Sequence, residues 1–298
     1  MIRLLSFSML LGLACGCGAR ELAAPSASDE VPALVTLATH RQVPRPPQLS
    51  RAEPVLWVAL EDHLGSHPAA MPLQLSSAGA PLTLEDGAGG SWTAASFTVR
   101  WRSVALPEPV MLARRIAGPF ASFESAERLA QRWRALGVTA SVAHPNDWEV
   151  WAPQGSIAPD GTTVREWTRR IHATVEPTLE TPEGVQPIKG PLQITAPDGL
   201  RWNRGVFRGP FRLQPDAYGS WTLIEQVAVE RYLEGVVPHE IGASSPVAAL
   251  QAQTVLARTW ALANSHRFQI DGYHLCSDTQ CQVYSDPRLA GAAVRQAI

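Results

Sequence analysis

The alternation of apolar and polar residues between positions 55 and 106 predicts strands. VLWVAL is a short apolar run, whereas PLQLSS, PLTLED and SFTVRWRSV place apolar side chains at every second position. A period of two is typical of strands that bury one face, and the Gly-rich EDGAGG is typical of a turn between strands. The pattern predicts a small β unit over residues 55–106.

A different pattern occupies residues 107–153. Ser122 suits the start of a helix, and Leu136 with Gly137 suits its end. The apolar positions between them recur three and four residues apart, at Ala126, Leu129, Ala130 and Trp133. Apolar runs on both sides predict strands, so this segment is expected to be a small α/β unit.

Residues 154–190 contain the Pro-rich string PTLETPEGVQP and are expected to connect two modules. Beyond them, GPLQITAPDGLRWNRGVFRGPFRLQPDAYGSWTLIEQ alternates apolar and polar positions, with Asp198 and Gly199 as a turn. A strand meander is therefore predicted here. Its aromatic residues suit a core, although aromatic faces can also stack on sugar rings.

Two helices are predicted after the meander. VAVERYLEG is expected to form a short helix ended by Gly235, and VVPHEIGASS a loop that holds Glu240. Ser245 and Pro246 suit the start of a second helix, which should run to about Arg267. The second helix is apolar nearly all round, so we expect it to be buried, with Arg258 hydrogen-bonded inside the protein.

Composition limits the possible classes of protein. The chain has 298 residues, of which 45% are hydrophobic and 17% charged, and its net charge is −2. This is enough apolar sequence for two or more modules of an α+β protein. The near-neutral charge provides no basic field for nucleic acid.

The N-terminus predicts export. MIRLLSFSMLLGLACGCG has Arg3, an apolar run and then small residues with cysteines, and the run is too short for a permanent membrane span. We expect residues 1–17 to be a signal sequence, with Cys17, or its rival Cys15, as a lipid attachment site. The Pro-rich residues 18–54 would then link a membrane anchor to the folded part in an extracytoplasmic cell envelope.

Cys276 and Cys281 remain for the folded part. Their spacing and an oxidising compartment favour a disulfide. With His274 they could instead contribute to a zinc site, although the three residues are too few for a complete ligand set.

Two resemblances give these patterns a functional meaning. GPFASFESAERLAQRWRALGV, within residues 107–153, resembles the SPOR family, which implies binding to peptidoglycan glycans that lack stem peptides. YLEGVVPHEI, ALQAQTVLARTWAL and LCSDTQCQVY, within residues 191–298, resemble the SpoIID/LytB family of bacterial cell-wall proteins. The second resemblance implies a lytic transglycosylase that cuts stripped glycan strands and leaves 1,6-anhydro ends, in sporulation or general wall turnover.

The SpoIID/LytB resemblance places the catalytic acid at Glu240, the acidic residue of its VP-x-E motif. One carboxyl group suffices for such a reaction, because the nucleophile is a hydroxyl of the substrate and no water has to be activated. A partly apolar surrounding could raise the pKa of Glu240. Some members of the family bind zinc at the segment beside His274, but this chain lacks a complete ligand set, so no cofactor is expected. The resemblance also implies that the domain continues beyond Ile298.

Further polar residues match motif positions and are expected to bind substrate: Gln251, Gln253, Arg258, Gln282 and Tyr284. Arg258 could equally pair with an internal carboxylate, and the other four could be structural hydrogen-bonding groups. His239 and His274 are not expected to be catalytic. The competing hypothesis is a non-catalytic envelope protein of the LytB type that grips glycans or stimulates a cell-wall amidase.

Overall fold

The computed structural model of the protein describes residues 35–36 and 42–298. The expected signal sequence, with Cys15 and Cys17, and most of the expected linker lie outside the described residues. The combination of strands and helices confirms the predicted α+β class. Among the helices of residues 42–298, none has the length and apolarity that a membrane span requires.

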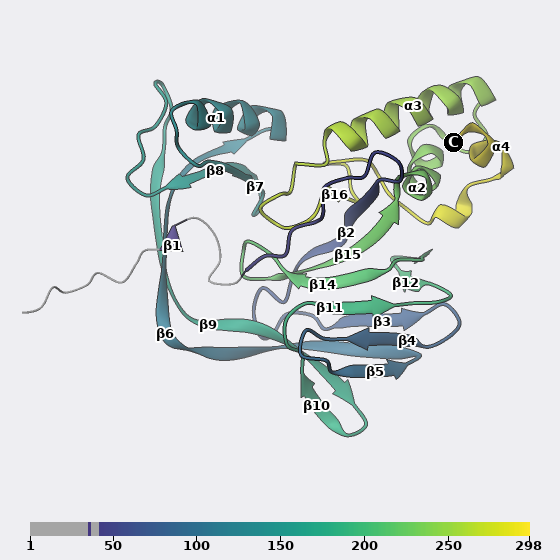
Figure 1. The fold of residues 1–298 in the computed structure, drawn as a ribbon, viewed down its shortest axis with the longest axis horizontal. Helices are drawn as coiled ribbons and strands as arrows, with labels where there is room; N and C mark the ends of the chain where they lie inside the picture. The colour runs from purple at the N-terminus through teal and green to yellow at the C-terminus, as the bar shows by residue number, and fades with distance from the viewer. Residues whose placement is uncertain (1–34, 37–41) are drawn as a thin grey trace, which may run out of the picture. The chain divides into compact units, whose positions relative to one another are not determined.

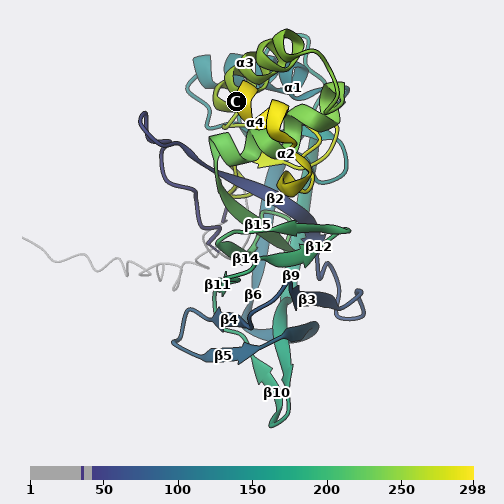
Figure 2. The same cartoon turned by 90° about the vertical axis from the view of Figure 1, so that its right-hand side faces the viewer.

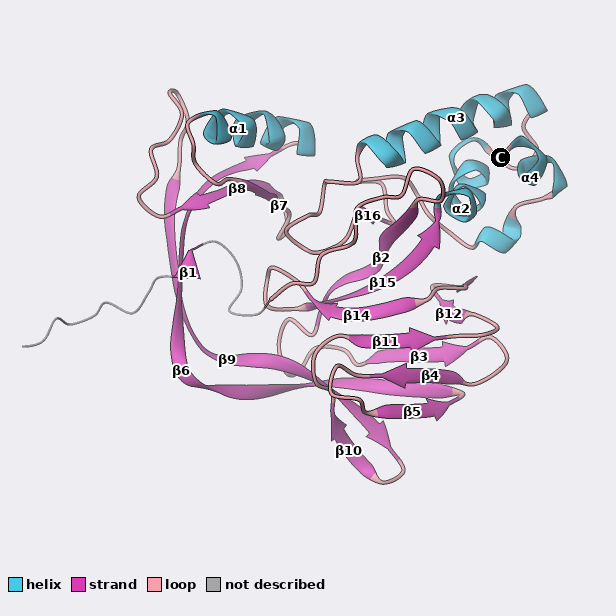
Figure 3. Ribbon diagram, viewed as in Figure 1, coloured by secondary structure: helices cyan, strands magenta, loops and turns pink. Residues whose placement is uncertain are grey.

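The strands of the described residues form two β-sheets (Figures 1 and 3). Within that part of the chain the first sheet has nine strands: β1 (Val35–Thr36), β3 (Leu73–Ser77), β6 (Ser96–Phe120), β7 (Ser141–Ala143), β8 (Trp148–Pro153), β9 (Arg165–Thr181), β10 (Gly184–Pro187), β12 (Leu200–Trp202) and β13 (Gly205–Phe207). The second has seven: β2 (Val55–Leu64), β4 (Leu82–Glu85), β5 (Ser91–Ala94), β11 (Leu192–Thr195), β14 (Phe211–Pro215), β15 (Trp221–Ala228) and β16 (Leu275–Cys276).

Four α-helices and one short 3₁₀ helix complete residues 42–298: α1 (Phe123–Ala135), α2 (Val229–Ile241), α3 (Val247–Ala263), α4 (Ala292–Ala297) and the 3₁₀ helix Pro287–Leu289. Figure 2 shows α2, α3 and α4 close together beyond β2 and β15. The helix α1 instead packs on β8 through its apolar face, as the spacing of its apolar residues predicts.

The long strand β6 joins regions that the sequence divides into separate units. Its first residues pair with β3, its last residues pair with β8, and β9 runs antiparallel to it over nearly its whole length. The predicted boundary near residue 106 therefore falls inside a continuous strand. At the predicted boundary the strand is interrupted only by a bulge between Ala105 and Val110, where Pro107 and Pro109 lie.

The strands predicted in residues 55–106 are present, but they do not form a sheet of their own. β2 pairs with β15, and β4 pairs with β11, both from the C-terminal part of the chain. Side chains of both sheets then form one apolar core that includes Leu75, Leu84 and Trp221. Burial of this shared core, rather than local sequence, decides which strands are neighbours.

Two connecting segments are more ordered than expected. Residues 165–187 form the antiparallel strands β9 and β10, in place of an irregular connection. Residues 42–54 have no helix or strand, but they lie against the folded part: the side-chain amide of Gln214 donates to the carbonyl of Pro44 at 3.2 Å, and Leu49 packs on the core.

Both predictions for the C-terminal helices need correction. The helix α2 does not end at Gly235 but continues to Ile241, so Glu240 lies in its last turn and not in a loop. The helix α3 ends at Ala263 and buries only one stripe, formed by Leu250, Thr254, Ala257 and Ala261. Its opposite side exposes Val255 and Leu256, which are 60% and 64% accessible. Apolar composition alone does not show which side of a helix meets the core.

Candidate active site around Glu240

Gly235 lets another segment cross α2 in its middle. A Cβ atom at this position would lie 2.4 Å from the Tyr284 ring and 2.5 Å from the carbonyl oxygen of Ser285. The backbone N–H of Ser285 donates to the carbonyl of Gly235 at 3.1 Å. The glycine is therefore required for close approach and not for ending the helix. Gly242, with φ of +86°, takes the capping role.

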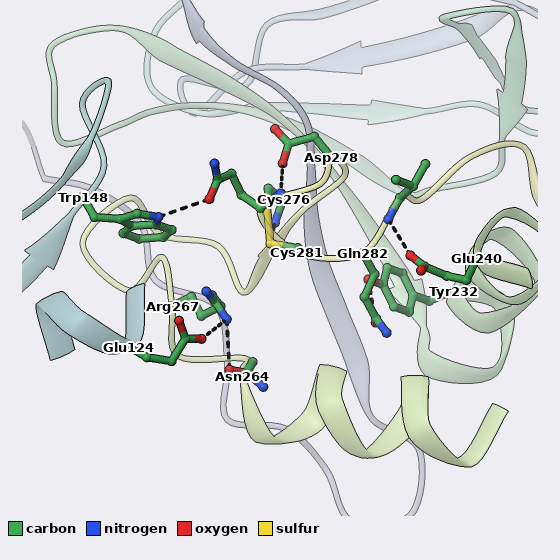
Figure 4. Close-up of a disulfide and its surroundings, with 12 residues drawn as sticks. Glu124, Trp148, Tyr232, Glu240, Asn264, Arg267, Cys276, Asp278, Cys281 and Gln282 are labelled. Atoms are coloured by element: carbon green, nitrogen blue, oxygen red, sulfur yellow. Dashed lines mark hydrogen bonds and ion pairs between the residues drawn. A yellow bond between two sulfur atoms is a disulfide. The ribbon is translucent and has the colours of Figure 1, made fainter. Parts of the chain in front are cut away.

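Glu240 is exposed at the C-terminal end of α2 (Figure 4). Its Oε1 accepts a hydrogen bond of 3.3 Å from the backbone N–H of Val283. Burial, together with the negative charge of Glu240, raises the pKa of Tyr232 on the same helix. One carboxylate oxygen is thus fixed by the backbone, and the side chain is open to solvent rather than enclosed by apolar residues.

The segment that meets Glu240 is held by a disulfide. Cys276 and Cys281 are bonded, with their Cα atoms 5.7 Å apart. Within this loop the Asp278 carboxylate accepts from the backbone N–H of Gln280 at 2.8 Å. The loop leads directly to Gln282 and Val283, so it sets the position of the N–H group that Glu240 accepts from (Figure 4).

His274 has a structural partner. Its Nδ1 accepts from the backbone N–H of Trp57 at 2.9 Å, and burial lowers its pKa to about 4. The imidazole is therefore neutral at physiological pH. Residues 42–298 contain no group of three or more His, Cys, Asp and Glu side chains arranged to hold a metal ion. With both cysteine sulfurs bonded to each other, the zinc alternative has no support in these residues.

Gln282 and Tyr284 are buried next to the site. Gln282 accepts from the Tyr232 hydroxyl at 3.3 Å. The Tyr284 hydroxyl donates to Glu225 at 2.9 Å, and Glu225 also accepts from the backbone N–H groups of Arg208 and Gly209. Through these hydrogen bonds, Gln282 and Tyr284 hold the segment 282–285 in place.

Glu225 is a buried residue next to the site that the sequence did not identify as a candidate. It is 1% exposed, and burial raises its pKa. The available signal was a lone carboxylate in the mostly apolar strand sequence WTLIEQVA, because such a carboxylate must have hydrogen-bond donors if the strand is central.

The remaining predicted substrate-binding residues lie on α3. Arg258 binds Glu230 of α2 through two hydrogen bonds of 3.0 and 2.5 Å, and it also donates to the carbonyl of Ile298. It is half-buried, not enclosed, and its carboxylate partner is 55% exposed. Gln251 is exposed and Gln253 is half-buried. Neither glutamine joins the hydrogen bonds around Glu240 in the described part of the chain.

A cavity of about 310 Å³ lies beside the same disulfide-closed segment. Its lining includes Glu61, Asp62 and Asp278 together with Asn203 and Tyr284. Partial burial and the neighbouring charge of Asp62 raise the pKa of Glu61, while a hydrogen bond with the Asn203 side chain opposes that shift. The sequence did not reveal this acidic cavity, because its carboxylates come from β2 and from the segment after β16.

Comparison with known proteins gives this part of the chain a family. Residues 217–298 match the family described as SpoIID, Stage II sporulation protein. An uncharacterized protein of Brachyspira hyodysenteriae is 34% identical over 107 residues, which cover 34% of this chain and 27% of that protein. The chain therefore spans about a quarter of the length of this relative. No solved structure matches.

The matched residues contain every element that positions Glu240: α2, α3, the disulfide-closed loop and the segment up to the last residue. The match links this region to sporulation and to a role related to the cell wall. The SPOR-like character of residues 107–153 stays a prediction. The segment that carries the candidate site, residues 217–298, is thus the part of the chain that is similar to the SpoIID family.

Proposed function

We propose that the protein is a lytic transglycosylase that cuts peptidoglycan glycan strands lacking stem peptides, with Glu240 as its general acid and base. The observation that carries the proposal is the position of Glu240. It is exposed to an incoming ligand, while the N–H of Val283 holds one oxygen. The SpoIID match of the surrounding residues supports a cell-wall substrate.

The reaction needs only one protein carboxyl group. Protonated Glu240 donates its proton to the glycosidic oxygen as the bond from that oxygen to C1 breaks. The resulting carboxylate then accepts the proton of the C6 hydroxyl of the same muramic acid unit, whose oxygen bonds to C1. The products are a free hydroxyl end and a 1,6-anhydro end, and Glu240 is again protonated.

The neighbouring acidic cavity gives an alternative chemistry that the products distinguish. Hydrolysis by two carboxylates would need a second group such as Glu61 or Asp278 to activate water. Hydrolysis leaves reducing ends, whereas the proposed reaction leaves 1,6-anhydro ends. Mass spectrometry of the products from amidase-treated sacculi therefore tests the proposal directly.

The sharpest variant is Glu240→Gln, compared with Glu234→Gln on the same helix. The amide at position 240 can still accept from Val283 but cannot transfer the proton. Glu234 binds Arg231 and lies one to two turns earlier. We expect loss of cleavage in the first variant only. Equal activity of Glu240→Gln and the unchanged protein would reject Glu240 as the acid.

The exposure of Glu240 also supports a second candidate function. The general acid of a glycan-cleaving enzyme is commonly held in an apolar pocket, whereas Glu240 is open to solvent. A protein with this site could instead grip glycans or stimulate a cell-wall amidase without cutting. Retained binding to stripped strands, with no cleavage products from the full chain, would favour this non-catalytic function.

A further inference from the structure

The first sheet has a second polar site on the side opposite to α1. One side of β8 presents Trp148 and Val150 to α1. Because side chains alternate along a strand, the next positions point to the other side. There Trp151 joins Ile116 of β6, with Ala217 and Tyr218 from the turn after β14 packed against them. This face is hollowed into a cavity of about 290 Å³.

Strand register brings three arginines to this cavity. Arg114 of β6 is directly opposite Trp167 of β9, and Arg165 and Arg169 lie two positions to either side of Trp167. All three arginines line the cavity, and Glu149 is the one carboxylate among its lining residues within the described part of the chain. Arg165 donates to Glu149 at 2.7 Å. The lining therefore has more positive than negative charge, which favours an anionic ligand.

The central guanidinium is held in a fixed position. The Arg114 guanidinium carbon lies 3.4 Å from the centre of the Trp151 ring and 3.9 Å from that of the Trp167 ring, so the group is sandwiched between them. The Trp151 indole N–H donates to Glu149 at 2.7 Å, which fixes that ring. Burial lowers the pKa of Arg114 to about 10, so the guanidinium keeps its charge at neutral pH.

The opposite wall is fixed as well. The Tyr218 hydroxyl donates to the buried Asp271 at 2.8 Å and accepts from the backbone N–H of His144 at 2.7 Å. Leu112, Ile116 and Ile171 add apolar surface to the lining. A rigid cavity near the lower end of the ~300–1,000 Å³ range of ligand sites, with a few charged groups, suits one small molecule.

We propose that this cavity binds the carboxylate or phosphate group of a small organic anion, with Arg114 and Arg169 as its principal cationic contacts. Arginine matches both groups because its planar fork can donate two parallel hydrogen bonds to two oxygens. The apolar residues and tryptophan edges would contact the uncharged part of the ligand. The proposal is independent of cleavage by Glu240, which lies in another part of the fold.

Isothermal titration of the full chain tests the proposal with three matched sugars: glucose, glucuronate and glucose 6-phosphate. We expect at least one of the charged sugars to bind about tenfold or more tightly than glucose, the equivalent of one charge-assisted hydrogen bond. Binding of glucuronate alone would identify a carboxylate site, and binding of glucose 6-phosphate alone a phosphate site. Equal binding of glucose, or no binding at millimolar concentration, would overturn the proposal.

Neighbouring arginines provide controls with the same change of charge. Arg115 follows Arg114 on β6, points to the other face and pairs with Glu166 at 2.5 Å. Arg170 follows Arg169 on β9 and is likewise on the other face. Arg114→Gln and Arg169→Gln should each weaken binding about tenfold or more, and Arg115→Gln and Arg170→Gln should not. Arg169 is exposed, so its variant tests the site even if Arg114→Gln fails to fold. Equal losses in all four variants would show that overall charge, not this cavity, attracts the anion.

Discussion

The two candidate sites of this protein are built in opposite ways. Glu240 is a single exposed carboxylate at the end of a helix, and its contact Val283 lies 43 positions later in the chain. The cavity around Arg114 is cationic, and its residues come from three strands, a loop and a turn spread over more than one hundred positions. The first is a short motif that can be recognised in one dimension. The second exists only because β6, β8 and β9 pair in one register.

The difference in burial has a chemical consequence. An exposed acid can reach a large polymer such as a glycan strand, and it remains in exchange with water. A guanidinium between two tryptophan rings is held rigid and can distinguish small ligands by charge and shape. The two sites are therefore suited to different partners, and each should respond to substitutions that leave the other unchanged.

The largest expected effect is that substitutions at the two sites impair different functions: Glu240→Gln impairs cleavage and Arg169→Gln weakens anion binding. Glu240→Gln should lower the rate of glycan cleavage about a hundred- to ten-thousand-fold, since that is the usual contribution of general acid–base catalysis. The same variant should bind glucuronate and glucose 6-phosphate as the unchanged protein does. Arg169→Gln should show the reverse pattern. Product analysis and calorimetry on the same preparations check both halves, and parallel losses in either variant would mean that the two sites are one.

A smaller effect is expected from Gly235→Ala, which adds a methyl group where Tyr284 and Ser285 cross α2. Overpacking of this kind costs about 1–3 kcal/mol in the free energy of unfolding. Displacement of Tyr284 and Ser285 by the added methyl group should also move the N–H of Val283 away from Glu240. Cleavage should then fall, without a change in anion binding. Urea unfolding measures the first effect.

Gly291→Ala is the matched control for this substitution. A Cβ atom at Gly291 would meet nothing within 4 Å. This change affects only the cap of α4 and should cost no more than about 1 kcal/mol. Equal destabilisation by both substitutions would contradict the close-approach explanation for Gly235.

Asp271, which accepts from Tyr218 in the wall of the Arg114 cavity, predicts that the stability of the protein depends on pH. Burial and the nearby charge of Asp216 raise the pKa of Asp271 well above its ordinary value. A carboxyl group with a raised folded-state pKa stabilises the protein fully below the unfolded-state value of about 4, and this contribution is lost as the pH rises toward the folded-state value. Asp271→Asn, which cannot ionise, should therefore gain stability relative to the unchanged protein as the pH increases from 4 to 8.

Thermal unfolding followed by circular dichroism across this pH range measures the gain, since 1 kcal/mol shifts Tm by about 2–4 °C in a protein of this size. Asp160→Asn, at an exposed carboxyl, is the control and should show no comparable trend. A constant difference between Asp271→Asn and the unchanged protein at all pH values would argue against a protonated Asp271 in the folded state.

The smallest expected effect concerns the ion pair that links α2 and α3. The Arg258–Glu230 pair is partly exposed, and pairs of this kind contribute about 0.2–1 kcal/mol. Arg258→Gln and Glu230→Gln should each destabilise the protein slightly, and the double variant should lose little more than either. If Arg258 also binds the glycan, only Arg258→Gln will raise KM for cleavage.

Several features of the fold followed from the sequence alone. The apolar spacing in residues 123–135 located α1 and its buried face, because one helical stripe must meet a core wherever that core lies. The strings YLEGVVPHEI and LCSDTQCQVY directed attention to Glu240 and to the cysteine pair, and the family match now covers both. The α+β class followed from the two periods of the apolar pattern.

Other features were decided only by tertiary structure. Gly235 has the sequence signature of a helix end, but the crossing of Tyr284 keeps it inside α2. Residues 55–106 have the strand pattern of a separate unit, yet β2 and β4 bury their apolar faces by pairing with β15 and β11.

The sandwich of Arg114 between Trp151 and Trp167 was invisible in the sequence for the same reason. Local periodicity determines which side of an element is apolar, because that depends on residues a few positions apart. Which distant element covers that side depends on the burial of the whole core, and the register that results decides which charged side chains finally meet.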